Sequence, residues 1–472
     1  MASDVSLTNA GTVNGSAGTA SPTFGGAGGA GAPAFLVASG GGLSNSGTGG
    51  GGGGHSGFDG EPILASGGSG GAGGQGAAGA VVNGGTAGNS GSLSGGTGGA
   101  GGTGGAGGSF SSGGPGGTGG IGGGGLSVAS GGQFTNSATV SGGAGGNGGT
   151  GGPGGTQGSG NGGAGGAGGA GVYGTTGTIA NAGLIEGGGG GSGGTAPIAG
   201  AAGAGGAGIS FSGGGVVTNQ SGGSIAGTGG AVAIEFGTGT SRLVVDPGAV
   251  FTGTVDGGNT LGSATVSTLE LASGATAGIL SGALGSQYID FAQVTVDSGA
   301  QWTMSGGGAL AGIVLTDSGT LTTTGGLTNS DATGGFGVTI ATGGELINKT
   351  TIQATSDNAV SGRTGTVTVV NYNHLIGNYS LASGVYMGGG GSLTNKSAGL
   401  IRALYGVRGG DAQGQAPITV VNAGQISSAA QTAGAGIYLL GVVRSPTSRP
   451  VRSRPNPKPK ATESGRRTSR SR

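Results

Sequence analysis

The segment Val128–Val140, VASGGQFTNSATV, contains the repeat from which the chain is built. It aligns throughout with Ile340–Ile352, IATGGELINKTTI, and with the shorter copy Val37–Thr48, VASGGGLSNSGT. In each copy a short alternating segment leads through a glycine turn into a second alternating segment that ends in asparagine. Alternation of apolar with small polar residues places every second side chain on one face of a strand. The repeat therefore predicts one coil, meaning one full turn, of a β-solenoid.

The spacing of the repeats supports a solenoid. Asn348, Asn371, Asn395 and Asn422 are separated by 23, 24 and 27 residues. A coil of roughly 20–25 residues is what a β-helix with three short strands needs. In the first half, six asparagines take the same position with wider spacings of 36, 38, 53, 45 and 38 residues: Asn9, Asn45, Asn83, Asn136, Asn181 and Asn219.

Two properties explain why asparagine recurs at this position. Tight turns need a positive φ, which Gly adopts freely and Asn tolerates better than most other residues. Asparagines stacked at one corner of successive coils can also form a ladder of side-chain hydrogen bonds. We expect both at the corners of the solenoid.

The composition excludes an ordinary globular domain. Of 472 residues 138 are Gly, only 7% are charged and 4% are aromatic. Glycine loses more backbone entropy on ordering than any other residue, so a conventional core would be hard to stabilise. Disorder and a solenoid of stacked coils remain, and the positive mean hydropathy of +0.10 favours the solenoid.

Glycine accounts for the extra length of the first half. Gly95–Gly125 and Gly142–Gly171 consist of GGA, GGT and GGN triplets with almost no large side chain. We expect irregular loops inserted between coils. The alternative is an ordered bundle of polyproline II strands with glycine at every contact.

The predicted fold is all-β, a right-handed parallel β-helix with long glycine-rich insertions and a disordered C-terminal tail. Residues 1–215 form the glycine-rich region, 216–442 the regular β-helix, and 443–472 the tail. Residues 1–440 hold six basic residues against fifteen acidic ones, whereas the last 32 residues hold ten against one. The abrupt change at the tail favours a frameshift product over a basic segment that contacts nucleic acid or a membrane.

Targeting signals are also absent from the sequence. The first residues, MASDVSLTNAG, show neither the basic nor the apolar region of a signal peptide, and no run approaches the ~18 apolar residues of a membrane-spanning helix. The chain has no cysteine, so disulfides and cysteine-based metal sites are excluded.

One stretch resembles a known family. Val216–Gly258, VVTNQSGGSIAGTGGAVAIEFGTGTSRLVVDPGAVFTGTVDGG, is similar to the passenger domains of bacterial autotransporters, the type V secretion proteins. The resemblance covers roughly Val216 to Leu440. It implies a β-helical passenger on the surface of a Gram-negative bacterium, joined to the outer membrane through a C-terminal barrel that this sequence does not show. The glycine triplets are also similar, less closely, to the glycine-rich repeat proteins of mycobacteria.

Candidate sites are few. His55 with Asp59 and Glu61 is the densest polar cluster, and His374 is expected at a turn; both are interpreted as solvated positions. GGSGG at Gly67–Gly71 fits the pattern of a nucleophile elbow but lacks its strand-to-helix context. The carboxylates that recur near coil ends, Asp246, Asp297 and Asp317, could act in pairs on a glycosidic bond but more often close turns. Trp302 and Tyr288 could stack a sugar, although packing is the expected role.

These observations predict a structural protein and not an enzyme, with no catalytic residue, no cofactor and no metal site. We expect a surface-displayed or secreted passenger that mediates adhesion, aggregation or biofilm contacts. Its expected partners are surface glycans or proteins and other copies of itself, and not nucleic acid. The alternatives are a β-helical glycan-active enzyme and a non-functional fragment of an autotransporter.

Overall fold

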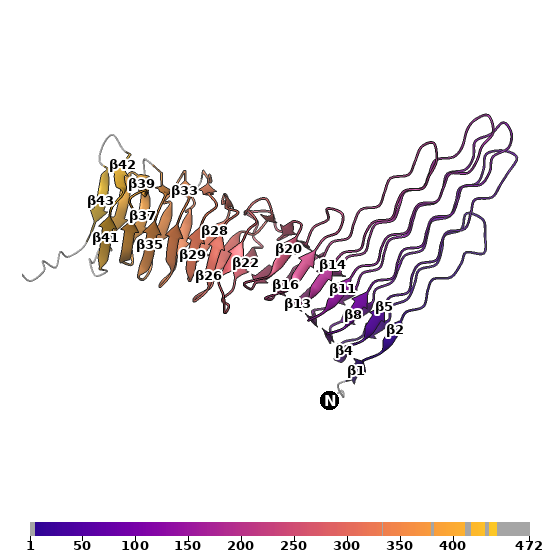
Figure 1. Cartoon of the computed structure of the whole chain (residues 1–472), viewed down its shortest axis with the longest axis horizontal. Coiled ribbons are helices and arrows are strands. Elements are labelled where there is room, and N and C mark those ends of the chain that lie inside the picture. Colours follow the sequence, from indigo (N-terminus) through magenta and orange to yellow (C-terminus); the bar gives the residue numbers. More distant parts are fainter. Residues whose placement is uncertain (1–4, 333, 379–381, 411–416, 430–433, 441–472) are drawn as a thin grey trace, which may run out of the picture.

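The chain forms a parallel β-helix. The computed structural model describes residues 5–332, 334–378, 382–410, 417–429 and 434–440, and the predicted tail at 443–472 lies outside them. These residues form 43 strands and no helix, and all paired strands run parallel (Figure 1). No helix that could cross a membrane is therefore found in the described part. The predicted all-β solenoid is confirmed.

One face of the solenoid is continuous from end to end. It is a single sheet of 15 strands, each contributed by a successive coil. Its strands are β1 (Val5–Asn9), β4 (Gly41–Asn45), β7 (Thr86–Asn89), β10 (Gly132–Asn136), β13 (Gly177–Asn181), β16 (Gly215–Asn219), β19 (Ser241–Val245), β22 (Ser267–Leu271), β25 (Gln293–Val296), β28 (Val314–Asp317), β31 (Val338–Ile340), β34 (Val360–Gly362), β37 (Ser383–Met387), β40 (Tyr405–Gly409) and β43 (Ala435–Leu439).

The strand that follows in each coil belongs to one of two seven-stranded sheets. The sheet of the first half contains β2 (Thr12–Asn14), β5 (Thr48–Gly50), β8 (Ser92–Ser94), β11 (Thr139–Ser141), β14 (Leu184–Glu186), β17 (Ser224–Ala226) and β20 (Val250–Thr252). The sheet of the second half contains β23 (Gly278–Leu280), β26 (Gln301–Met304), β29 (Thr320–Thr323), β32 (Glu345–Asn348), β35 (Val367–Asn371), β38 (Gly391–Asn395) and β41 (Ile418–Asn422).

The third strand of each coil also lies in one of two sheets. Eight strands form the first: β3 (Phe35–Val37), β6 (Ala80–Asn83), β9 (Leu126–Ala129), β12 (Val172–Gly174), β15 (Ile209–Phe211), β18 (Ile234–Phe236), β21 (Val255–Asp256) and β24 (Tyr288–Ile289). Six form the other: β27 (Gly308–Ala309), β30 (Leu327–Asn329), β33 (Thr351–Ala354), β36 (His374–Ile376), β39 (Leu400–Ala403) and β42 (Gln425–Ser428).

The core is a set of apolar columns that run along the solenoid axis. One column consists of Phe134, Ile179, Val217, Leu243 and Leu269, which are paired in register on successive strands and are all buried. Burial of each such side chain contributes roughly 1.5–3 kcal/mol. Because parallel register repeats the same position in every coil, alternation within one short strand is enough to build a continuous core.

Asparagine ladders line two corners of the solenoid. In the first half the amide Nδ2 of Asn136 donates to Oδ1 of Asn181 at 2.8 Å, and the same bond links each neighbouring pair from Asn9 to Asn219. In the second half bonds of 2.8 Å link Asn348, Asn371, Asn395 and Asn422. The predicted ladder is confirmed there.

Two details of the asparagine prediction are wrong. The third member of the first ladder is Asn89 and not Asn83, which is exposed at the end of β6. None of the ladder asparagines has a positive φ; among the described residues, the non-glycine positions that do are Ser130 and Asp290. Asparagine is needed at this corner for its amide, which donates to backbone carbonyls as well as to the next asparagine.

The glycine insertions form an ordered bundle, and the expectation of irregular loops is wrong. Five loops leave the solenoid and return to it side by side (Figure 1). We call them layers 1 to 5 of the glycine bundle: residues 15–33, 51–79, 95–125, 142–171 and 187–208. Within layer 3, Gly99 and Gly120 are joined by a backbone bond of 2.8 Å between the outgoing and returning strands. Gly98 donates to Ala144 of layer 4 at the same distance.

A three-residue period governs the bundle, as in a polyproline II helix. The exposure of residues 95–103 and 142–153 repeats as intermediate, buried, exposed. In each triplet the amide of the first glycine donates to the next layer. The amide of the second glycine donates to the previous layer when it lies in an outgoing strand, and to the outgoing strand of its own layer when it lies in a returning strand. The third residue points to solvent. A Cβ on Gly98 would lie 2.0 Å from the carbonyl oxygen of Gly120, and one on Gly99 would lie 2.1 Å from that of His55. The first two positions must therefore be glycine.

At the two edges of the bundle, residues with side chains replace glycine at positions that are close-packed in the middle layers. Ala199 and Ala202 occupy the first position in layer 5, beyond the reach of the short connection that follows it. At the opposite edge, next to layer 1, the second position of layer 2 carries His55 and Phe58, whose side chains are exposed although their amides donate to Gly29 and Gly26 of layer 1 at 2.9 Å. The sequence thus marks both edges of the bundle by replacing glycine.

The ladder makes a stability prediction. Asn136→Ala removes the bonds of its amide to Asn181, Ala138 and Leu184 and takes one of three acceptors from the Nδ2 of Asn89, so we expect a loss of about 3 kcal/mol. Asn83→Ala, which truncates an exposed side chain, should cost less than about 0.5 kcal/mol. Urea unfolding monitored by circular dichroism measures both, and equal midpoints would contradict a structural role for the ladder.

The packing of the bundle predicts opposite effects on stability for substitutions at two adjacent glycines. A Cβ at Gly188 would lie 2.0 Å from the carbonyl oxygen of Gly143, whereas one at Gly189 has nothing within 4 Å. We expect Gly188→Ala to destabilise the bundle by about 3 kcal/mol and Gly189→Ala to stabilise it by about 0.5 kcal/mol. Amide hydrogen exchange over layers 4 and 5 should separate the two variants, and similar exchange in both would rule out close packing.

Candidate functional site

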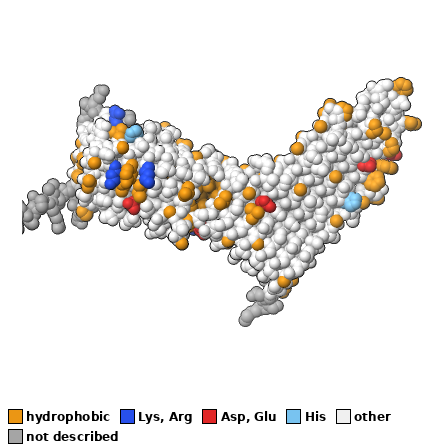
Figure 2. All heavy atoms as spheres, viewed as in Figure 1, with side chains coloured by type: hydrophobic (Ala, Val, Ile, Leu, Met, Phe, Trp, Pro, Cys, Tyr) orange, Lys and Arg blue, Asp and Glu red, His pale blue; other side chains and the backbone are white. Residues whose placement is uncertain are grey.

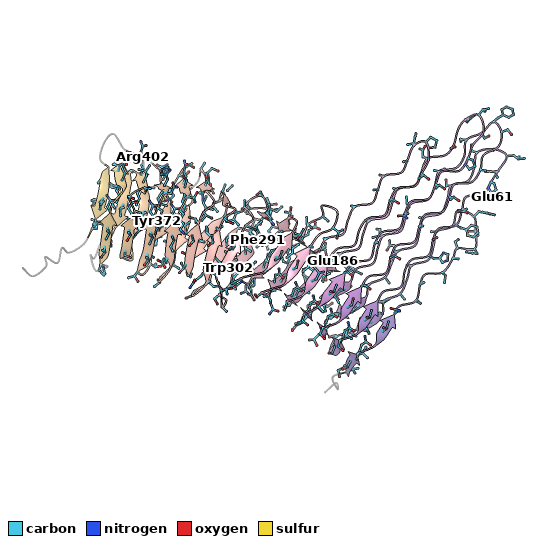
Figure 3. All side chains as sticks on the ribbon, viewed as in Figure 1. Glu61, Glu186, Phe291, Trp302, Tyr372 and Arg402 are labelled. Atoms are coloured by element: carbon cyan, nitrogen blue, oxygen red, sulfur yellow. The ribbon has the colours of Figure 1, made fainter. Side chains whose placement is uncertain are left out.

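The polar cluster of the first half is dispersed in the structure. The ring Nδ1 of exposed His55 lies 3.0 Å from the carbonyl of Ser56, and Oδ1 of Asp59 accepts a 2.9 Å bond from the backbone of Thr103. Glu61 is exposed near the tip of the bundle (Figure 3). No group of three metal-ligating side chains occurs among the described residues.

The other histidine and the elbow-like motif also lie apart from any site. His374 begins β36 and is exposed, so the expected turn is instead the start of a strand. The GGSGG motif lies in the returning strand of layer 2, where the side chain of Ser69 faces solvent.

Both predicted sugar-stacking aromatics are in the core. Trp302 is 2% exposed, and its Nε1 donates to the carbonyl of Ala272 at 2.8 Å (Figure 3). Tyr288 is 5% exposed, and burial raises the pKa of its hydroxyl to about 12. The packing role expected for these side chains is the one the structure shows.

The recurring aspartates have different environments. Asp246, which follows β19, is partly buried, and desolvation raises its pKa while a backbone bond from Ser221 lowers it. Asp297 follows β25 and is also partly buried. Asp317 is fully buried at the end of β28. Because Asp317 has no contact with solvent, it cannot act on a polysaccharide together with Asp297.

Asp317 continues the column of the first asparagine ladder. After Asn219 this column passes through Val245, Leu271 and Val296 before reaching Asp317. Its Oδ1 accepts a 3.0 Å bond from the backbone of Gly319, and its Oδ2 has no partner. Burial, aided by the charge of Glu345, raises the pKa of Asp317 to about 7 despite backbone bonds from Gly319 and Leu321. The group is a polar residue in a column that has become apolar.

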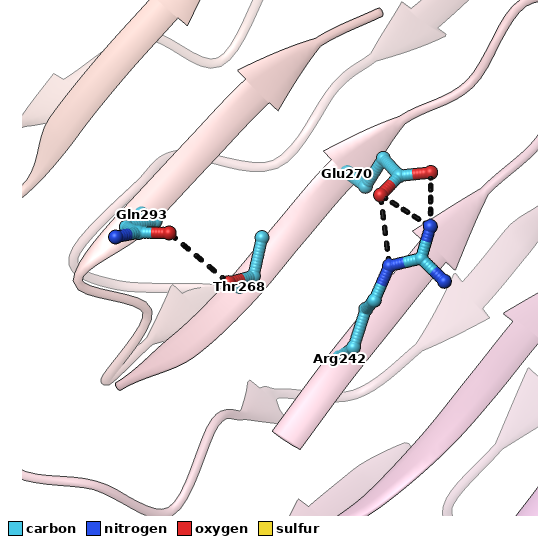
Figure 4. Close-up of polar contacts among 4 residues, drawn as sticks. All are labelled: Arg242, Thr268, Glu270 and Gln293. Atoms are coloured by element: carbon cyan, nitrogen blue, oxygen red, sulfur yellow. Dashed lines mark hydrogen bonds and ion pairs between the residues drawn. The ribbon is translucent and has the colours of Figure 1, made fainter. Parts of the chain in front are cut away.

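A second carboxyl cluster lies on the outer surface of the continuous sheet. Arg242 on β19 holds Glu270 on β22 through bonds of 2.9, 2.7 and 2.6 Å, and Thr268 and Gln293 form a 3.4 Å contact nearby (Figure 4). Burial, then the charge of Glu270 and a hydrogen bond to it, raise the pKa of Asp297 to about 6, against the opposing charge of Arg242. The carboxylate of Glu270 is thus already engaged in an ion pair with Arg242.

The two faces of layers 3 to 5 of the glycine bundle are extensive, regular and uncharged. Layers 3 to 5 contain no Asp, Glu, Lys or Arg. The outgoing strands expose small side chains at every third position, among them Thr97, Thr103, Asn147, Thr150 and Ser192. The amide of each such residue and the carbonyl of the first glycine have no backbone partner, although Asn147 caps the amide of Ser192 at 3.0 Å. Sequence reasoning missed this surface because it treated the triplets as loops.

Comparisons with known proteins place few limits on function. Neither a protein-family model nor a curated protein matches the chain. A solved structure that it is similar to is a springtail antifreeze protein from Granisotoma rainieri, described as a bundle of nine polyproline type II helices whose crystal waters match the ice lattice. Sequence identity is 26%, and the match covers 41% of this chain and 92% of that one with a TM-score of 0.12. At that TM-score the likeness has no bearing on function.

Asp317 predicts a pH dependence of stability. Its pKa of about 7 in the folded chain exceeds the ordinary 3.8, so the folded state binds this proton more tightly than the unfolded state. Its contribution should be full below pH 4 and fall between about pH 4 and pH 7, by roughly 4 kcal/mol in total.

Asp317→Asn removes this titration. Compared with the wild-type chain, the variant should gain stability progressively from pH 4 to pH 7, as measured by urea unfolding at each pH. Asp59→Asn, at an exposed position, is the matched control and should leave the profile of the wild type unchanged. Parallel profiles for wild type and Asp317→Asn would show that this carboxyl does not hold its proton.

Proposed function

We propose that the chain is a non-catalytic surface protein that adheres to other surfaces, including other copies of itself, through many weak repeated contacts. The observation that carries this proposal is the regular, uncharged surface of layers 3 to 5 of the glycine bundle, whose outgoing strands repeat one exposed small side chain in every three residues. Such faces offer many equivalent contacts and no single pocket.

The chemistry of the faces fits weak multiple binding. Most outgoing triplets present a backbone amide and a backbone carbonyl to solvent beside a hydroxyl, amide or methyl group, the exceptions being the amides of Thr103 and Ser192, which are capped by Asp59 and Asn147. A single neutral hydrogen bond contributes about 1 kcal/mol net, so one triplet binds nothing tightly. Many triplets on a rigid frame add to a useful avidity when the partner also repeats. Display on a cell surface is inferred from the resemblance of residues 216–440 to autotransporter passengers.

Bead aggregation tests this role. Beads coated with the chain should aggregate, and Thr103→Glu/Thr150→Glu, which places charge on the outgoing face of layers 3 and 4, should slow aggregation severalfold by like-charge repulsion. Ser273→Glu/Thr276→Glu adds equal charge at exposed positions outside the bundle and should have little effect. Beads that stay dispersed when coated with the wild-type chain would overturn the self-adhesive role.

A second candidate is supported by the regularity of the same faces. A rigid, uncharged surface with a fixed repeat along the strands and between layers can match the surface of a crystal, and ice is the crystal that water itself forms. Inhibition of ice recrystallisation by the wild-type chain, lost in Thr103→Glu/Thr150→Glu, would favour this function. Unaltered ice growth at millimolar protein would exclude it.

A further inference from the structure

The coils at the C-terminal end differ from the uncharged bundle. Figure 2 shows Lys or Arg side chains beside hydrophobic ones on this end of the solenoid. On the continuous face, strand pairing places Ser361 of β34, Tyr386 of β37, Arg408 of β40 and Tyr438 of β43 in one row. Three of these four side chains are large and carry a polar or charged group.

A cavity of about 360 Å³ opens beside this row. Asp357, Asn358, Arg363, Tyr386 and Arg408 line it. Asp357 and Asn358 precede β34, and Arg363 follows it, so the three flank one short strand. Tyr386 and Arg408 come from the next two coils. The cavity thus combines two guanidinium groups, one carboxylate, one amide and one aromatic ring.

Aromatic rings hold both arginines in place. The Cζ of Arg363 lies 4.7 Å from the ring centre of Phe336, and the Cζ of Arg408 lies 5.7 Å from that of Tyr386 and 5.8 Å from that of Tyr405. Neither arginine forms an ion pair within the described residues. Stacking on an aromatic face orients a guanidinium and leaves its N–H groups free for an anion.

One polar side chain in this row lacks a hydrogen-bond partner among the described residues. Ser361 is fully buried next to Tyr386 in the row, and its Oγ has no hydrogen-bond partner in the described part of the chain. Such an unpaired hydroxyl lowers stability. Asn358 is buried as well, and its Oδ1 accepts a 2.6 Å bond from the backbone of Ser383, which fixes the amide at the rim. The cavity therefore lies beside a buried hydroxyl that lowers the stability of the fold and an amide that is held in a fixed orientation.

We propose that this cavity binds a carboxylated sugar unit of an acidic polysaccharide. The two guanidinium groups match a carboxylate, with which arginine forms paired, charge-assisted hydrogen bonds. The ring of Tyr386 offers an apolar surface to the C–H face of a sugar, and the carboxylate of Asp357 accepts hydrogen bonds from sugar hydroxyls. Asp357 repels a carboxylate, with one negative charge, less than a sulfate or phosphate ion with two, and those ions offer no hydroxyl or ring for Asp357 and Tyr386. The assignment does not rest on the adhesive role of the glycine bundle.

Titration calorimetry of the full chain with trigalacturonate tests the site. We expect saturable binding with one site per chain. Arg363→Gln and Arg408→Gln should each weaken it about tenfold, which corresponds to 1.4 kcal/mol. Lys396→Gln is the matched control, because it removes the same charge from a half-buried lysine that lies over Tyr372 on another face and should leave the affinity within twofold.

Three further probes decide the ligand class. The methyl ester of trigalacturonate keeps the sugar rings but lacks the charge, so it should bind at least about tenfold more weakly. Galacturonic acid monomer should compete with the trimer, and sodium sulfate should not at equal ionic strength. No binding by the wild-type chain, equal binding of the ester, equal competition by sulfate, or wild-type affinity in both folded arginine variants would overturn the proposal.

Discussion

Backbone hydrogen bonds between successive turns of the chain are the interaction on which both halves of this molecule depend. In the solenoid they join parallel strands, and in the glycine bundle they join extended triplets at 2.7–3.1 Å. The two regions satisfy the same donors and acceptors by different means. Strands keep their side chains because alternation directs them inward or outward, whereas the bundle brings backbones so close that two positions in three carry no Cβ.

This difference explains how far the sequence could be interpreted. The coil length, the inward alternation and the ladder from Asn348 to Asn422 follow from spacing alone, because parallel register repeats each position once per coil. Asn83 was assigned to the ladder because it also follows apolar residues. Only pairing with Asn45 and Asn136 shows that Asn89 holds the corner.

The glycine bundle could be predicted from the sequence, whereas the cavity could not. Strict GGX triplets, and their loss at His55, Phe58, Ala199 and Ala202, record which positions face a neighbour. The periodicity of apolar residues, which usually indicates secondary structure, gives no information there because the bundle has no apolar core. The cavity has no local motif: Arg363, Tyr386 and Arg408 come from three coils, and only the observed register brings them together.

Packing by triplets also restricts how the length of the chain can change. An insertion of one or two residues in a layer would turn its exposed side chains toward carbonyl oxygens that now lie about 2 Å from where a Cβ would be. An insertion of three residues preserves the pattern but lengthens the outgoing strand beyond its returning partner unless that strand gains three as well. Length changes within the strands should therefore come in steps of three residues matched in both strands of a layer, whereas the turn at the tip accepts other lengths, as layers 3 and 4 with 31 and 30 residues show. In the gene, changes within the strands should come in steps of nine nucleotides at two sites.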